Sequence, residues 1–565
     1  MKHLNRLAII ATALLMTTSC EQMMDTDSTS VIVDKGQLLD SPNDSLYSAM
    51  GILAQVRNLG ERYVLLGELR GDLMTASDNA SESLSEIAKL NMTADNDYAD
   101  MKDYYNVVNN CNYALARMDT TVTIYQSRVL VPEYAAIKTM RDWTYWQMAL
   151  AYGEVSWIEQ PLLSVDEALA SPATINMEEV AKNIIDDLTP FVNTKALNYG
   201  TIDGYDSQKM FYPTKLLVAD LYLYLNQYHE AARYYYEYIH DHSLVISSDY
   251  ANNWRRDNRS SIDLRHTDSY LGEMLCGMMY SSDSREERPL LIRWTYHETP
   301  CLLPATSFVN DMTHAMHFYA EDGALSVGSY LEGDLRGQAV GSGDSITASS
   351  MDTRMLGAKK MTRVYKYLLG ASRNESGCDP ENTAVGSLYV QRMLPLVRVP
   401  HVYLRFAEAV NRLGMPSVAF AVLKYGLTEE TLANAARVSP WELEKGKDLL
   451  DFSWLSGSNA TNVVGTAARG RGRGISLDTE HYVISANCQN LADSITAVED
   501  CIVDEMAAET AFEGNRFFDL LRVARHRDAF PAYMAEKISA KFDDANAAKT
   551  RLQSTDVWFM QRKKQ

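Results

Sequence analysis

The sequence predicts a mainly α-helical protein in which paired helices carry a loop-rich insertion with short strands. Apolar residues recur at helical spacing before and after the insertion, as in the stripe from Val107 to Met118. Two segments, at 213–242 and 407–423, combine small residues with a turn residue in the pattern of tetratricopeptide-like helix pairs. Between them, residues 251–395 lose the helical period and are rich in Gly, Ser and Asp. We therefore expect an interrupted helical scaffold and not a tandem repeat.

The first 20 residues have the pattern of an export signal. Two basic residues precede Leu7–Met16, an apolar run too short to span a bilayer, which needs about 20 residues. Small residues then precede Cys20, as in a lipoprotein cleavage box, although Thr17 stands where such a box usually has Leu. We expect residues 1–19 to be a lipoprotein signal peptide, in preference to an ordinary secretory one. Acyl chains on Cys20 would then be the only membrane attachment.

Composition limits the function classes open to the mature chain. Residues 20–37 are acidic and polar, with too little apolar content to fold, so we interpret them as a flexible tether. The chain of 565 residues has 53 Lys and Arg against 74 Asp and Glu, a formal net charge of −21. Phosphate contacts need clustered Lys and Arg, so we expect no nucleic-acid partner. No GxSxG, HExxH or dinucleotide fingerprint occurs, and we expect no cofactor.

Residues 38–250 form the N-terminal helical region, and their best helix pair runs from Pro213 to His242. Ala219 and Ala231 are small enough to let two antiparallel helices approach closely, and Asn226 between them can adopt a turn conformation. This segment therefore predicts a tetratricopeptide-like unit.

Residues 251–395 are expected to form loops and short strands, such as one at Leu290–Tyr296. Loops on a rigid scaffold are where binding usually resides. A second loop region, Ser456–Ala486, contains the run Arg469-Gly-Arg471-Gly-Arg473. Guanidinium groups and backbone N–H groups favour anions, although a solvated loop is the simpler interpretation of this run.

The C-terminal region, residues 396–565, contains the second helix pair and a closing helix. Thr496 and Glu499 predict a capping box at the start of that helix. The row Glu505, Glu509 and Glu513 comes next on one helix face, where carboxylates four apart repel by a few tenths of a kcal/mol per pair unless cations lie against them. The nearest cations in the sequence are Arg516 and Arg522.

The closing run, with its pattern EG-x-R-x-x-DL, resembles the signature of the SusD/RagB family. The residues that carry the resemblance are Glu505, Glu509, Phe512, Glu513, Gly514, Arg516, Phe518, Asp519, Leu520 and Arg522. The segment Leu394–Gly414 is also similar to the family, whereas Met506 and Thr510 stand where the family usually has Arg and an aromatic residue. In the family this motif is structural, which implies a structural role for Glu509, Glu513, Gly514, Arg516, Asp519 and Arg522.

The resemblance implies a SusD-like fold and a non-enzymatic, lipid-anchored protein of the outer membrane that faces outward. Such a protein captures an oligomeric nutrient, glycan or oligopeptide, and delivers it to a SusC-like TonB-dependent transporter. The sequence does not distinguish the two ligand classes. Two further functions stay open: a surface glycoside hydrolase, suggested only by the carboxylate row, and a repeat-based protein-interaction scaffold.

Ligand-binding candidates come from irregular sequence, because aromatic rings on helix-pair stripes are used in packing. The aromatic candidates are Trp254, Trp294 and Tyr296, and the polar candidates, on a loop that resembles a ligand-side segment of the family, are Asp72, Asp78 and Asn79. His314, His317 and Glu321 have a spacing that would align three ligands on one helix. Their apolar neighbours favour a buried segment, and we expect no metal.

The attachment hypothesis predicts the behaviour of one variant. Cys20→Ala removes the acylated thiol, so the protein should move from the membrane fraction to the soluble fraction, whereas the control Cys111→Ala should remain membrane-bound. Cell fractionation and immunoblotting measure this distribution. Unchanged membrane association of Cys20→Ala would contradict the lipid anchor.

Overall fold

The structure is a computed structural model of the chain. It describes residues 42–170, 172–247, 273–280, 291–297, 299–314, 317–321, 328–334, 336, 346–347, 350–356, 359–367, 371–373, 389–391, 393–471, 484 and 487–562. Cys20, the predicted tether and Trp254 lie outside these ranges. No helix in the described ranges is long and apolar enough to cross a membrane.

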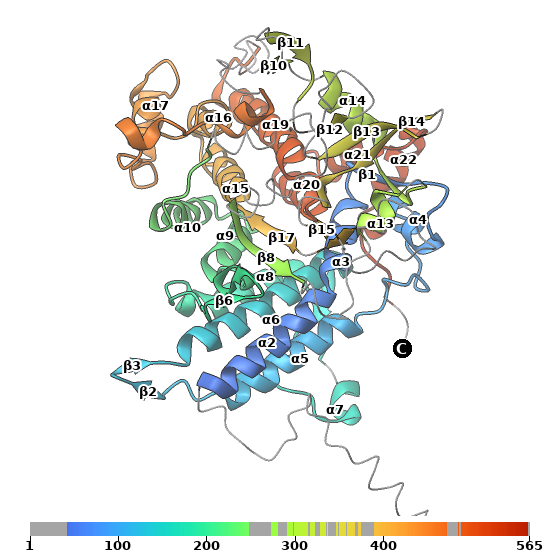
Figure 1. Ribbon diagram of the computed structural model, residues 1–565, viewed down its shortest axis with the longest axis vertical. Helices are drawn as coiled ribbons and strands as arrows, with labels where there is room; N and C mark the ends of the chain where they lie inside the picture. Colours follow the sequence, from blue (N-terminus) through green and yellow to red (C-terminus); the bar gives the residue numbers. More distant parts are fainter. Residues whose placement is uncertain are drawn as a thin grey trace, which may run out of the picture.

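The N-terminal region is a succession of helices with short hairpins between them (Figure 1). Its helices are α2 (Pro42–Asn58), α3 (Gly60–Glu68), α4 (Glu82–Lys89), α5 (Lys102–Arg117), α6 (Val131–Tyr152), α7 (Val165–Leu169), α8 (Met177–Leu188), α9 (Thr214–Tyr224) and α10 (Tyr228–Asp241). Its strands are β1 (Met74–Ala76), β2 (Thr123–Ile124), β3 (Ser127–Arg128), β4 (Glu154–Ser156), β5 (Thr174–Asn176), β6 (Thr201–Ile202) and β7 (Tyr205–Asp206). Strands β2–β3, β4–β5 and β6–β7 pair antiparallel.

The predicted helix pairs are present. Helices α9 and α10 pack against each other with Ala219 and Ala231 fully buried, and Asn226 adopts φ +64° in the turn between them. The second pair is α15 (Val399–Arg412) and α16 (Pro416–Lys424), joined through Gly414 at φ +81°. Contacts run from α5 to α6, α8, α9, α10 and α15 in turn, which makes one stacked helical scaffold. The mainly α fold with tetratricopeptide-like pairs is thus confirmed.

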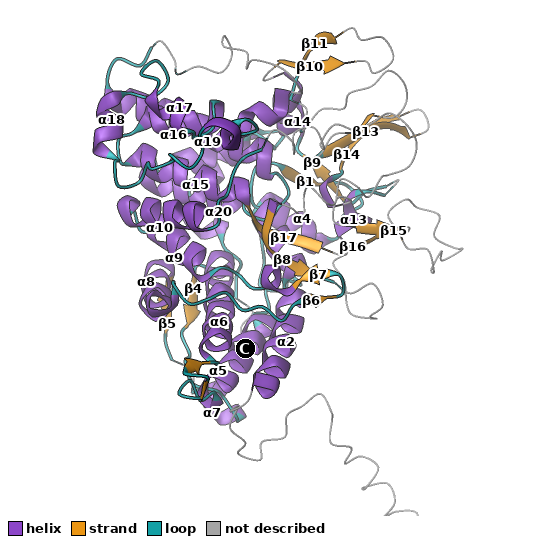
Figure 2. Ribbon diagram, turned by 60° about the vertical axis from the view of Figure 1, so that its left-hand side comes forward, coloured by secondary structure: helices purple, strands orange, loops and turns teal. Residues whose placement is uncertain are grey.

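The insertion adds short antiparallel strands on one side of the helices (Figures 1 and 2). Its elements are β8 (Met274–Met279), α13 (Leu291–Thr295), β9 (Leu302–Pro304), α14 (Thr306–His314), β10 (His317–Glu321), β11 (Gly328–Glu332), β12 (Ile346–Thr347), β13 (Met351–Leu356), β14 (Lys359–Val364), β15 (Ala371–Arg373), β16 (Tyr389–Gln391) and β17 (Met393–Arg398). Strand β17 pairs with β8, and β9 pairs with β1 of the N-terminal region. The expected strand at Leu290–Tyr296 is wrong, because Leu291–Thr295 forms a helical turn. A short apolar run does not distinguish the two by pattern alone.

The C-terminal helices complete the described fold. They are α17 (Glu429–Ala433), α18 (Pro440–Lys445), α19 (Leu491–Thr510), α20 (Arg516–His526), α21 (Ala532–Ser539) and α22 (Ala545–Leu552). Phe518 of α20 contacts Trp146 of α6 and Tyr224 of α9, with ring centroids 5.7 and 6.4 Å away. This contact joins the closing motif to the first helix pairs.

The predicted capping box is wrong. Helix α19 begins at Leu491, and Asn490 caps it by accepting a hydrogen bond from the backbone N–H of Asp493. Thr496 lies inside the helix, where its hydroxyl donates to the carbonyl of Ala492. Glu499 instead accepts from the Arg527 guanidinium at 2.6 Å. Asn is at least as good an N-cap as Thr, so the local sequence allows the helix to begin after either Asn490 or Thr496.

Glu505, Glu509 and Glu513, hereafter the carboxylate row, are at most 3% exposed and surrounded by cations. The cations are not Arg516 and Arg522, as the sequence suggested, but Arg336, Lys366 and Arg398. The Arg336 guanidinium lies 2.6 Å from Glu505 and 3.0 Å from Glu509. Arg398 donates two hydrogen bonds to Glu513, at 2.7 and 2.8 Å, and Lys366 lies 2.6 Å from the same carboxylate.

The Glu513 carboxylate is held ionised by this arrangement. Burial alone would raise its pKa, but Arg398 and Lys366 lower that pKa to about 2. Arg522 has a different partner, the buried Glu408, at 2.6 Å. The charged side chains Glu513 and Arg522 of the closing motif are therefore used in buried ion pairs.

The segment between α19 and α20 lies directly on α3. Glu68 accepts hydrogen bonds from the backbone N–H groups of Phe512, at 3.1 Å, and Gly514, at 2.7 Å. Gly514 adopts φ +89°, and a Cβ there would lie 2.5 Å from the ring of Tyr63. A Cβ on Gly67 would overlap the carbonyl group of Gly514. The two glycines thus allow backbone segments far apart in sequence to touch.

The same substitution should have opposite effects at two glycines. Gly67→Ala places a methyl group on the carbonyl of Gly514 and should destabilise the protein by roughly 3 kcal/mol or more. Gly51→Ala, in exposed helical surface with no atom near the added Cβ, should stabilise it by about 0.5–1 kcal/mol. Chemical denaturation measures both. A Gly67→Ala protein as stable as Gly51→Ala would contradict the close backbone contact.

The carboxylate row predicts a pH dependence. Glu513 has a folded pKa of about 2, below its unfolded value, so it stabilises the fold above about pH 4.5 and this contribution, about 3 kcal/mol, is lost as the pH falls towards 2. Glu513→Gln leaves Arg398 and Lys366 without their shared carboxylate, which should cost about 3–5 kcal/mol at pH 7 and less in acid.

The matched control for Glu513→Gln is Glu178→Gln, which removes an exposed pair with Lys182 and should cost less than about 0.5 kcal/mol. Urea denaturation of the two variants between pH 3 and pH 7 measures both effects. Equal, small losses in the two variants at pH 7 would contradict the role of the carboxylate row.

Candidate functional site

The loop after β1 is an exposed surface held in place by the insertion. Strand β1 pairs with β9 so that Ala76 lies opposite Leu302. Beyond the strand, the backbone N–H of Ser77 donates to the carbonyl of Cys301 at 2.8 Å, and its hydroxyl donates to that of Pro300 at 2.6 Å. The next two residues, Asp78 and Asn79, are exposed.

Trp294 lies on the neighbouring element. Helix α13 packs against β9, the strand that pairs with β1, and Figures 1 and 2 show α13 close to β1. The indole of Trp294 is half-buried against the core, while Arg293 beside it is exposed. The structure thus brings three of the sequence-predicted residues to one edge of the molecule. We refer to Asp78, Asn79 and Trp294 as the surface site.

Asp72 anchors the start of this loop. Its carboxylate accepts two hydrogen bonds from the Arg516 guanidinium, at 2.6 and 2.8 Å. Burial would raise the pKa of Asp72, but Arg516 holds that pKa below its usual value. The Lys541 ammonium group donates to the carbonyl oxygens of Leu69 and Gly71, both at 2.6 Å. Burial lowers the pKa of Lys541 to about 7. Asp72 therefore positions the loop and does not project from it.

Tyr296 is part of the core. Its side chain is 1% exposed, with the Arg363 guanidinium 4.0 Å from the ring centroid and Tyr365 edge-on at 5.8 Å. A ring enclosed in this way has no free face for a ligand, and its contribution is to fix the end of α13. Trp254, the third aromatic candidate, lies outside the described residues.

The surface site has the chemical groups that recognise a polar, ring-shaped ligand. The side chains of Asp78 and Asn79 form no hydrogen bond with the described residues, so a carboxylate and an amide remain available to hydroxyl groups. The half-buried indole of Trp294, on the helix that packs against β9, offers an apolar surface on the neighbouring element. Sequence reasoning missed two residues close to Trp294 in the chain. Arg293 is exposed, and His297 is half-buried. Their only sequence signal was adjacency to Trp294.

Two other sequence candidates, the arginine run at 469–473 and the His314, His317 and Glu321 set, are described only in part by the structure. Residues Thr466–Arg471 make a 3-10 turn in which Gly470 packs against the Asp334 carboxylate, and Arg473 lies outside the described ranges. His314 ends α14 and His317 begins β10, so they do not share one helix. Within the described ranges, no group of three or more His, Cys, Asp or Glu side chains could hold a metal ion.

The carboxylates that suggested a glycoside hydrolase are not available for catalysis. General acid–base chemistry needs carboxyl groups that reach a substrate. The carboxylate row is buried, and its oxygens accept from Arg336 and Arg398. The observation that favoured a hydrolase is therefore explained by packing.

Comparison with known proteins identifies the fold of this chain but not its function. No protein-family model matches the sequence, and no curated protein matches it. A SusD superfamily protein from Bacteroides thetaiotaomicron VPI-5482 has 15% identity and a TM-score of 0.55, covering 91% of this chain and 98% of its own. B. fragilis NanU has 16% identity and a TM-score of 0.52, covering 88% and 92%.

A third solved structure, from Bacteroides vulgatus ATCC 8482, is named as a candidate sugar-binding protein. It has 15% identity and a TM-score of 0.51, and the match covers 86% of this chain and 88% of its own. At such identities the likeness establishes architecture. The chain has the SusD-like fold that its helix pairs and closing motif predict.

Proposed function

We propose that this protein is a non-enzymatic receptor that captures an oligosaccharide on the surface site and passes it to a TonB-dependent outer-membrane transporter. The observation that carries the proposal is the packing of β1, β9 and α13, which places the exposed Asp78 and Asn79 and the half-buried Trp294 on neighbouring elements. Lipid on Cys20 would keep the receptor at the membrane, facing outward.

The composition of the surface site supports a sugar. A sugar ring presents hydroxyl groups at its rim and C–H groups on its faces. Carboxylate and amide groups form hydrogen bonds with hydroxyls, and an indole packs against an apolar ring face. The fold likeness extends to a protein named as a candidate sugar-binding protein, which supports the same class. An oligopeptide is the second ligand class and is tested beside the first.

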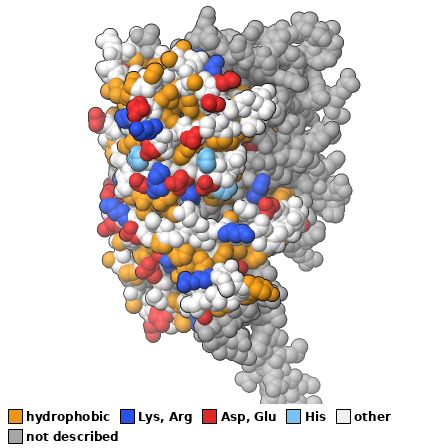
Figure 3. All heavy atoms as spheres, turned by 90° about the vertical axis from the view of Figure 1, so that its left-hand side faces the viewer, with side chains coloured by type: hydrophobic (Ala, Val, Ile, Leu, Met, Phe, Trp, Pro, Cys, Tyr) orange, Lys and Arg blue, Asp and Glu red, His pale blue; other side chains and the backbone are white. Residues whose placement is uncertain are grey.

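The helical scaffold gives little support to a repeat-based interaction protein or to a nucleic-acid binder. A repeat scaffold binds partners on the open inner face of its helix pairs. Here α20 packs on the first helix pairs, because Phe518 contacts Trp146 and Tyr224. On the outer face in Figure 3, acidic and basic side chains are interspersed, unlike the basic patch of a nucleic-acid binder.

A receptor that hands its ligand on should bind it moderately. A few hydrogen bonds and one aromatic contact are consistent with a Kd between about 1 μM and 1 mM, or about 4–8 kcal/mol. No metal or covalent step is part of this mechanism. Screening oligosaccharides and oligopeptides against the pure protein identifies the ligand class. Binding of oligopeptides alone would overturn the sugar assignment.

Trp294→Ala should weaken oligosaccharide binding at least about tenfold, or about 1.4 kcal/mol, because the indole contact is lost. Trp454→Ala is the matched control, a half-buried Trp beside Phe452 on the helical side, and should leave affinity unchanged. Tyr235→Ala removes a buried ring whose hydroxyl donates to Asp220, so it should reduce stability by about 3–5 kcal/mol and leave the affinity of the folded protein intact.

Titration calorimetry on the three variants measures affinity, and thermal denaturation measures stability. Full affinity in Trp294→Ala would show that the ligand binds elsewhere. Loss of affinity in Trp454→Ala to the same degree would show that the effect is not specific to the surface site.

A further inference from the structure

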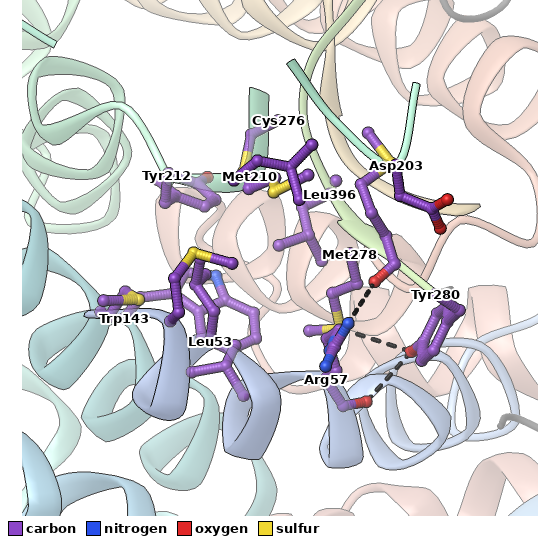
Figure 4. A pocket seen from close by; sticks show the side chains of 16 residues that line it. Leu53, Arg57, Trp143, Asp203, Met210, Tyr212, Cys276, Met278, Tyr280 and Leu396 are labelled. Atoms are coloured by element: carbon purple, nitrogen blue, oxygen red, sulfur yellow. Dashed lines mark hydrogen bonds between the residues drawn. The ribbon is translucent and has the colours of Figure 1, made fainter. Parts of the chain in front are cut away.

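A cavity of about 220 Å³ lies away from the surface site, where α2, α6, the β6–β7 hairpin and the β8–β17 ribbon meet (Figure 4). None of its lining residues belongs to the surface site. Five of the lining residues are methionines, and we call it the methionine cavity: Met50, Met140, Met210, Met278 and Met279.

The walls of the methionine cavity are largely apolar. Trp143 and Tyr212 line one side, and Arg57, Asp203 and Tyr280 lie on the opposite side (Figure 4). Tyr280, Arg57 and Tyr212 form hydrogen bonds within the protein. Tyr280 donates to the backbone carbonyl of Arg57 at 3.0 Å, and the Arg57 guanidinium donates to the carbonyl of Met279 at 3.1 Å. Tyr212 donates to the carboxylate of Asp220 at 3.1 Å.

The thiol in the wall is also apolar in character. Cys276 is fully buried, and burial raises the pKa of its thiol above the usual value, so it is uncharged near neutral pH. The cavity therefore offers dispersion contacts and little hydrogen bonding. Ordered water needs two to four polar partners, and most of the side chains that line this cavity are apolar.

The size of the cavity sets the size of a ligand. An apolar cavity of about 150 Å³ lined by aliphatic and aromatic side chains stays dry and binds benzene. The methionine cavity, at about 220 Å³, is larger and has room for a fused pair of small rings.

The cavity has a rim that reaches the surface. Met50 and Met210 are half-buried, as is Ile202 of the β6–β7 hairpin, while Asp203 in the hairpin turn is exposed. Residues Asp203 and Gly204 both have positive φ, +50° and +84°, which forms the tight turn at this rim. A ligand would enter between this hairpin and α2.

We propose that the methionine cavity is a second binding site, which takes a small uncharged aromatic molecule the size of indole. Thioether sulfurs make favourable contacts with ring edges, and flexible methionine side chains adapt to the shape of a bound ring. Trp143 and Tyr212 add aromatic surface on one side. This proposal does not depend on the sugar assignment, because the two sites share no residue.

Methyl NMR of the full chain with ¹³C-methyl-labelled methionine tests the proposal, with indole as the probe. Indole should shift the methyl signals of Met50, Met140, Met210, Met278 and Met279 saturably, whereas the buried Met506 and Met534 elsewhere should not move. Shifts that do not saturate, or that are as large for Met506 and Met534, overturn the site. 1-Hexanol that binds as tightly as indole overturns the aromatic assignment.

Filling the cavity provides a second measurement. Met210→Trp, and the rim variant Ile202→Trp in case the first does not fold, should weaken indole binding at least tenfold. Leu115→Trp is the control, a half-buried helical residue outside the cavity that should leave binding unchanged. Wild-type indole affinity in a folded Met210→Trp or Ile202→Trp protein overturns the proposal.

Discussion

The structure depends on a row of buried charges that must be neutralised from distant parts of the chain. The carboxylate row, which spans the end of α19 and the segment after it, would repel itself if it were left alone in a medium of low dielectric. Arg336 and Lys366 come from the insertion, and Arg398 comes from the strand that leads into the second helix pair. Replacing whole buried ion pairs by apolar side chains is often neutral for stability, whereas removing one partner leaves an uncompensated buried charge and is strongly destabilising. We infer that the row ties the insertion to the helices, because Arg336 and Lys366 both come from the insertion.

The contacts around the row also determine where the surface site lies. The segment after α19 lies on Glu68 and Gly67 of α3, and Arg516 then holds Asp72. Strand β1 starts two residues later and pairs with β9, which brings Asp78 and Asn79 to the edge beside α13. The closing motif thus helps to position the surface site but is not part of it. The methionine cavity is built separately, from α2, α6 and the β8–β17 ribbon.

The sequence correctly predicted those features of the fold that depend on residues close together in the chain. Ala219, Ala231 and Asn226 identified a helix pair because small residues and a turn residue act within one hairpin. The partners of the carboxylate row were predicted wrongly, since Arg336 lies about 170 residues away and nothing in its neighbourhood marks it as buried. Asn490 and Thr496 are both good caps, and only tertiary packing selects the first. Asp78, Asn79 and Trp294 were named from irregular sequence, but their proximity arises from strand pairing across more than 200 residues.

The central claim is that an oligosaccharide binds, without being cleaved, on the edge formed by β1, β9 and α13. Hydrogen–deuterium exchange on the full chain, with the oligosaccharide identified by screening, tests it most directly. The account predicts slower amide exchange in peptides covering 74–80 and 291–302, no change in α19, and recovery of the oligosaccharide intact. Protection confined to other segments, or recovery of a shortened oligosaccharide, would contradict it.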